Sequence, residues 1–143
     1  MADRPHPYAP HEPVTRGSLY RRILNKTDYF VPDEGGPSGH DGRPSGFVFL
    51  PDSGEEYTSM FLTDCVDQKA MLRECPEKCP GCGLCEVSVT DLIELGARVT
   101  YEPEWGFGHT GVWGLDSTKP GGKLRRKIAF RAIVHLRPQM YRW

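Results

Sequence analysis

Short apolar runs separated by polar, glycine-rich or proline-rich stretches are the main hydrophobic pattern of this chain. Phe47–Leu50 lies between Gly46 and Pro51. Tyr57–Leu62 follows a Pro-Asp-Ser-Gly turn and is rich in aromatic and β-forming residues. Apolar runs of this length, bounded by turn residues, are typical of strands. We therefore expect the two segments to pair as a β-hairpin.

Three segments have patterns that favour helices. The first runs from Asp64, as cap, to Met71 or Leu72. The second begins at Ser88, which has Asp91 three residues later and a stop signal at Gly96. The third and clearest predicted helix is Lys123–Ala132, preceded by a proline and a glycine pair. Its apolar residues form one stripe and its basic residues spread around the rest.

The remaining apolar segments are short and β-rich. Ser18–Leu24 fits either a strand or a short helix. Further strands are expected at Val99–Tyr101, Gly108–Leu115 and Ile133–Leu136. This order of elements predicts a single α+β domain over residues 17–143, preceded by a flexible tail over residues 1–16.

Composition limits the class of protein. The 143 residues are 38% hydrophobic and include 16 glycines and 13 prolines, which predicts a modest core with long loops. No apolar run approaches the roughly 18 residues of a membrane span, so we expect no membrane association. Met1–Pro7 has no apolar signal segment. We therefore expect a cytoplasmic protein, in which thiols stay reduced.

Charge is distributed unevenly along the chain. Lys119–Trp143 carries eight Lys or Arg and no acidic residue, although the net charge of the chain is −1. This asymmetry predicts either an anionic partner or pairing with the acidic part of the chain. If the partner is a nucleic acid, the residues that would contact phosphates are Lys123, Arg125, Arg126, Lys127 and Arg131. The other interpretation is the solvated face of an amphipathic helix.

The most specific chemical pattern is a group of four cysteines within eleven residues. They follow the spacing C-x3-C-x2-C-x2-C and are Cys75, Cys79, Cys82 and Cys85. The central C-P-G-C-G run has the form of a zinc knuckle, in which a tight turn directs two sulfurs at one ion. We expect a structural zinc here. Because four sulfurs on one loop are crowded, the fourth ligand could instead be Cys65, His40 or His109.

Two other uses of these cysteines stay open. Cys75, Cys79 and Cys82 have the spacing of an iron–sulfur ligand set, although the ferredoxin order is not met. The remaining possibility is a loop of free or incidentally paired thiols.

Catalysis has little support in the sequence. His109 lies in a stretch rich in glycine and aromatic residues and has a side chain suited to proton transfer. The chain has no G-x-S-x-G, H-E-x-x-H or phosphate-loop motif. A structural or exposed histidine is the simpler interpretation, so we expect no enzymatic activity.

Three short segments together resemble small bacterial proteins of unassigned activity. They are Leu19–Ile23 (L-Y-R-R-I), the Gly42–Ser45 turn leading into Phe47, and Gly108-His109 with the basic helix and Ile133–Pro138. The resemblance implies a bacterial single-domain protein and no particular activity. The cysteine cluster is not part of it.

These patterns lead to three hypotheses about function. The first is a non-catalytic accessory protein that binds another protein and holds a structural zinc in the Cys75–Cys85 loop. The second is nucleic-acid binding through the basic segment Lys119–Trp143. The third is a small hydrolase or transferase that uses His109.

Overall fold

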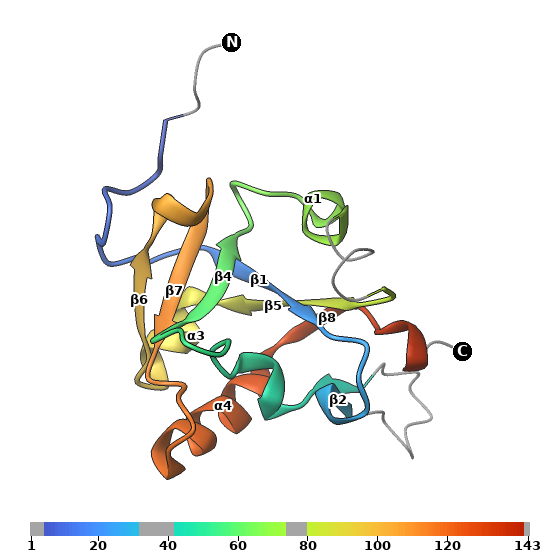
Figure 1. The fold of residues 1–143 in the computed structure, drawn as a ribbon. Helices are drawn as coiled ribbons and strands as arrows, with labels where there is room; N and C mark the ends of the chain where they lie inside the picture. Colours follow the sequence, from blue (N-terminus) through green and yellow to red (C-terminus); the bar gives the residue numbers. More distant parts are fainter. Residues whose placement is uncertain (1–4, 32–41, 74–79, 142–143) are drawn as a thin grey trace.

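A six-stranded antiparallel sheet is the central element of the computed structural model, which describes residues 5–31, 42–73 and 80–141 (Figure 1). The strand order is β6-β7-β4-β1-β5-β8, and every neighbouring pair is antiparallel. The strands are β1 (Ser18–Ile23), β4 (Thr58–Leu62), β5 (Gly83–Ser88), β6 (Arg98–Tyr101), β7 (His109–Trp113) and β8 (Ile133–Leu136).

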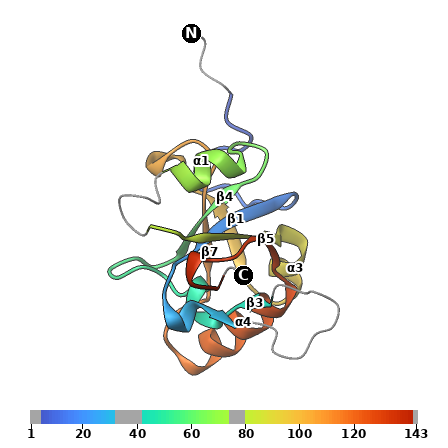
Figure 2. The ribbon, with the colours of Figure 1, turned by 90° about the vertical axis from the view of Figure 1, so that its right-hand side faces the viewer.

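Helices lie on both faces of this sheet. The described helices are α1 (Gln68–Arg73), α3 (Val89–Glu94) and α4 (Lys119–Arg131). Figures 1 and 2 show α1 on one side of the sheet and α4 on the other. A second small sheet pairs β2 (Phe30–Val31) with β3 (Arg43–Pro44), and four 3₁₀ turns complete the described chain. The predicted α+β class is confirmed.

Strand β1 distributes its side chains between two layers of core. Leu19 and Ile23 point into the main core, which also contains Ile128 of α4. Tyr20 points to the opposite face and packs with Met71 of α1. Strand alternation places successive side chains on opposite faces, so the apolar residues of one strand hold helices on both sides.

The predicted hairpin between Phe47–Leu50 and Tyr57–Leu62 is wrong. Gly46–Phe49 forms the 3₁₀ turn η2, in which the Leu50 N–H donates to the Phe47 carbonyl. Strand β4 pairs instead with β1 and β7. The adjacent side chains of Val48 and Phe49 are both buried, a pattern that a one-faced strand does not give. The described hairpin is formed by β6 and β7.

The N-terminal segment runs along the outer edge of β6. The Val14 N–H donates to the Val99 carbonyl at 2.9 Å, and the His11 N–H donates to the Tyr101 carbonyl at 2.7 Å. Pro13 forms a bridge with Thr100, and the Val14 side chain is 1% exposed. Part of the predicted tail therefore covers a sheet edge, which would otherwise leave backbone groups unpaired.

Helix α4 begins four residues before its predicted start at Lys123. Thr118 caps it by accepting a hydrogen bond from the Gly121 N–H. Pro120 lies in the first turn, where its missing N–H removes no intrahelical hydrogen bond. The proline and glycine pair that precede the predicted helix are therefore part of it.

Candidate functional site

One face of α4 presents three basic side chains and an aromatic ring to solvent. Lys123, Arg126, Lys127 and Phe130 are all exposed, and Phe130 is 69% exposed. Their spacing of i, i+3, i+4 and i+7 places them on one side of a helix. Here this set, together with Arg43, is called the basic face. The opposite side of α4 packs against the main core.

Arg43 joins the basic face from β3. Its guanidinium lies over the Phe130 ring, 4.3 Å from the ring centroid. Residues 43 and 130 are far apart in sequence, so sequence patterning could not find this contact. The half-buried Arg43 and the exposed Phe130 make this part of the surface both cationic and aromatic.

Arg125 has a structural role beside the basic face. It is half-buried, and its Nη1 donates to the Gly46 carbonyl at 3.4 Å. Burial, and then the charge of Arg126, lower the pKa of Arg125 below its ordinary value. Arg125 therefore ties α4 to the turn η2, and its charge is partly withdrawn from solvent.

Of the five basic residues predicted to contact phosphates, Arg131 is the one with a described ion pair to acidic side chains. Arg131 Nη1 lies 2.9 Å from Asp91 Oδ1 and 3.6 Å from Glu94 Oε2, both on α3. Among the residues that the structure describes, Lys123, Arg126 and Lys127 form no ion pair with an acidic side chain. The outer side of α4 thus carries cations that the described acidic residues do not neutralise.

The predicted cysteine site is only partly described. Cys75 and Cys79 lie outside the described residues. Cys82 is disulfide-bonded, Cys85 is a free thiol, and both Cys65 and Cys85 are buried. Cys85 faces the main core from β5, and its thiol donates to the Arg21 carbonyl at 3.5 Å. Burial raises the pKa of Cys85 to about 12.

Metal ligation needs a thiolate. Cys85 would have to leave the core and lose its proton before it could serve as a zinc ligand. The zinc and iron–sulfur interpretations of the loop therefore stay predictions, and the described cysteines do not add to them.

Cys85 should react with thiol reagents only when the protein unfolds. Its raised pKa leaves little thiolate near neutral pH, and the reactive form is the thiolate. We expect labelling by iodoacetamide, followed by peptide mass spectrometry, to be slow in native protein and fast in denaturant. Fast native labelling, or labelling that appears only after chelator is added, would show that Cys85 lies outside the core or at a metal.

His109 is enclosed rather than presented to a substrate. It is 5% exposed, and its ring lies near the rings of Tyr57 and Phe61, at centroid distances of 5.9 and 5.2 Å. Its Nδ1 lies 3.0 Å from the Glu102 carbonyl, the described hydrogen-bond partner of the ring. Burial lowers the pKa of His109 below its ordinary value. Its environment is that of a structural histidine.

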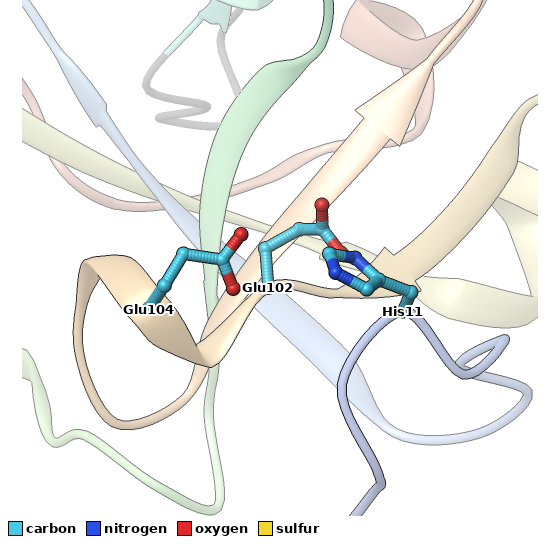
Figure 3. Close-up of side chains that lie close together, drawn as sticks. All are labelled: His11, Glu102 and Glu104. Atoms are coloured by element: carbon cyan, nitrogen blue, oxygen red, sulfur yellow. The ribbon is translucent and has the colours of Figure 1, made fainter.

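A cluster of one histidine and two carboxylates is not apparent from the sequence. Figure 3 shows His11, Glu102 and Glu104 side by side, at the place where the N-terminal segment meets the β6–β7 connection. One ligand atom from each lies within 4.8 Å of the others, and His11 Nδ1 is 2.7 Å from Glu102 Oε2. The sequence Glu102-Pro103-Glu104 indicates two neighbouring carboxylates, but no sequence pattern predicts that His11 lies beside them.

Comparisons with known proteins assign no family. The chain matches no family model, no curated protein and no solved structure. Among the described residues, none of the helices combines the length and hydrophobicity needed to cross a membrane. The expectations of a zinc ion, a protein partner and a nucleic-acid partner stay predictions.

Proposed function

We propose that this protein binds nucleic acid through the basic face. The observation that carries the proposal is the exposed stripe of Lys123, Arg126 and Lys127, which ends at Phe130 under the Arg43 guanidinium. Cations that lack described acidic partners are available to phosphates, and phosphate contacts supply most of the affinity in non-specific nucleic-acid binding.

The exposed ring favours nucleic acid over an acidic protein. Phe130 is 69% exposed and lies beside the cations. The cations alone would be enough to bind an acidic peptide, which has no use for an exposed aromatic ring. An aromatic face next to a cationic groove or surface is typical of proteins that stack unpaired bases. A single-stranded nucleic acid offers both phosphates and unpaired bases, so it fits this surface best.

The basic face is held on a fixed support. Ile128 and Ala129 anchor α4 in the main core, and both are at most 3% exposed. Arg125 bonds to the carbonyl of Gly46, whose own position is close to the side chains of α4. A binding surface on a packed helix loses little conformational entropy when a ligand binds.

Fluorescence anisotropy with labelled oligothymidylate, measured across a range of salt concentrations, tests the proposal. The affinity should fall steeply as salt rises. Substituting Lys123, Arg126 and Lys127 together by alanine should make the salt dependence shallower. The negative slope of log affinity against log salt should shrink in magnitude by about 2, at about 0.7 for each lost phosphate contact. Phe130→Ala should weaken binding by roughly tenfold with little change in the slope.

Lys69→Ala is the matched control, because Lys69 is an exposed lysine on α1, on the opposite side of the sheet. It should leave both affinity and slope unchanged. Alanine favours helix at exposed positions, so the triple variant should keep its fold. Absence of binding by the native protein, or equal slopes for native and triple-variant protein, would refute the proposal.

A further inference from the structure

The cluster of His11, Glu102 and Glu104 joins two segments that are distant in sequence. Glu102 follows β6, Glu104 belongs to the 3₁₀ turn η3 (Pro103–Trp105), and His11 comes from the N-terminal segment. Figure 3 shows the Glu102 carboxylate between the His11 ring and the Glu104 carboxylate. Backbone hydrogen bonds between the N-terminal segment and β6 hold the three side chains in this arrangement.

Glu102 is an unusually buried carboxylate for this chain. Its side chain is 6% exposed, whereas that of His11 is 67% exposed. The His11 ring is its described polar partner, through Oε2; no described residue donates a hydrogen bond to Oε1. Burial of a charged group is unfavourable unless the charge is paired and hydrogen-bonded. Glu102 thus engages His11 through one carboxylate oxygen and has a second oxygen available to a cation.

No described lysine or arginine supplies that positive charge. Among the described residues, neither Glu102 nor Glu104 forms an ion pair with Lys or Arg. Burial first, and then the charges of Glu102, Glu104 and Glu55, raise the pKa of Tyr57 to about 12. Two carboxylates and an imidazole thus face a region with an excess of negative charge.

We propose that His11, Glu102 and Glu104 bind a divalent transition-metal ion of the zinc type. One imidazole nitrogen and two carboxylate oxygens are ligands that zinc accepts, and three protein ligands leave positions for water. Imidazole also favours such ions over calcium and magnesium, which prefer oxygen ligands alone. The ion would bridge the N-terminal segment to the β6–β7 connection. This inference is independent of nucleic-acid binding by α4.

Cobalt(II) titration followed by absorption spectroscopy tests the site, because cobalt substitutes for zinc and reports its ligands. Chelator-treated full-length protein should bind cobalt without the intense thiolate charge-transfer band that cysteine ligands give. Calorimetry with zinc should show the same site. His11→Ala and Glu104→Gln should each weaken binding by at least about tenfold. Both side chains are exposed, so these substitutions should not impair folding as Glu102→Gln could.

Glu12→Gln is the matched control, since Glu12 is an exposed carboxylate next to His11 in the same segment. It should bind cobalt and zinc as the native protein does. Metal should also raise the melting temperature of native protein and of Glu12→Gln, but not of His11→Ala. Lack of binding, or equal binding by the native protein and by His11→Ala and Glu104→Gln, would overturn the proposal.

Discussion

Replacing Arg21 by alanine is expected to lower the free energy of unfolding by about 3 kcal/mol. The Arg21 guanidinium is 14% exposed and donates to three backbone carbonyls, those of Val48 (2.8 Å), Ser59 (2.7 Å) and Leu50 (3.3 Å). Loss of the guanidinium leaves these carbonyls without this donor. Each buried carbonyl that loses its hydrogen bond should cost about 1 kcal/mol or more of folding free energy. Urea denaturation followed by circular dichroism measures the change.

Arg16→Ala is the control for Arg21→Ala. Arg16 is exposed just before β1, and its replacement should change the stability by less than about 0.5 kcal/mol. A loss of below 1 kcal/mol for Arg21→Ala would contradict the role assigned to its three hydrogen bonds. Because two of the carbonyls belong to η2 and its end, the substitution should also loosen the support of α4.

Two adjacent glycines of α4 should respond to alanine in opposite directions. At Gly121 a Cβ atom would lie 2.3 Å from the backbone oxygen of Asp116, a contact that a flexible side chain cannot relieve. Gly121→Ala should therefore destabilise the protein by about 2 kcal/mol through overpacking. At Gly122 the nearest atoms are the ends of arginine side chains at 3.4 and 3.6 Å. Gly122→Ala should stabilise by up to about 1 kcal/mol, because alanine favours helix.

Thermal unfolding of the two variants, measured side by side, decides this prediction. Each variant serves as the control for the other, since both add one methyl group to the first turns of one helix. Equal shifts in melting temperature would mean that the backbone of Asp116 does not lie against Gly121 as the structure has it. A lower value for Gly122→Ala than for Gly121→Ala would also contradict the account.

Local signals in the sequence predicted several elements correctly. Ser88 caps α3, where its Oγ accepts from the Asp91 N–H, and a cap followed by an acidic residue is visible in the sequence. Ile133–Leu136 is a strand and the basic segment is a helix, as their patterns indicate. In these cases the signal and the structure lie within the same few residues, so no distant contact was needed.

Features that depend on distant contacts were not predictable in the same way. The apolar run at residues 47–50 has the pattern of a strand, but it forms a buried turn that packs against α4 and accepts a hydrogen bond from Arg21. The cysteine spacing does not reveal that Cys85 points into the core from β5. The contact of His11 with Glu102 spans 91 positions, and only the pairing of the N-terminal segment with β6 brings it about.

Amide NMR spectra recorded during titration with oligothymidylate test the central claim most directly. Nucleic-acid binding by the basic face predicts that the largest changes in resonance position fall within residues 123–130 of α4 and near Arg43. The amide resonances of α1, on the opposite face of the sheet, should not shift. Unchanged spectra, or changes centred on α1 or on the β6–β7 connection with α4 unaffected, would contradict the claim.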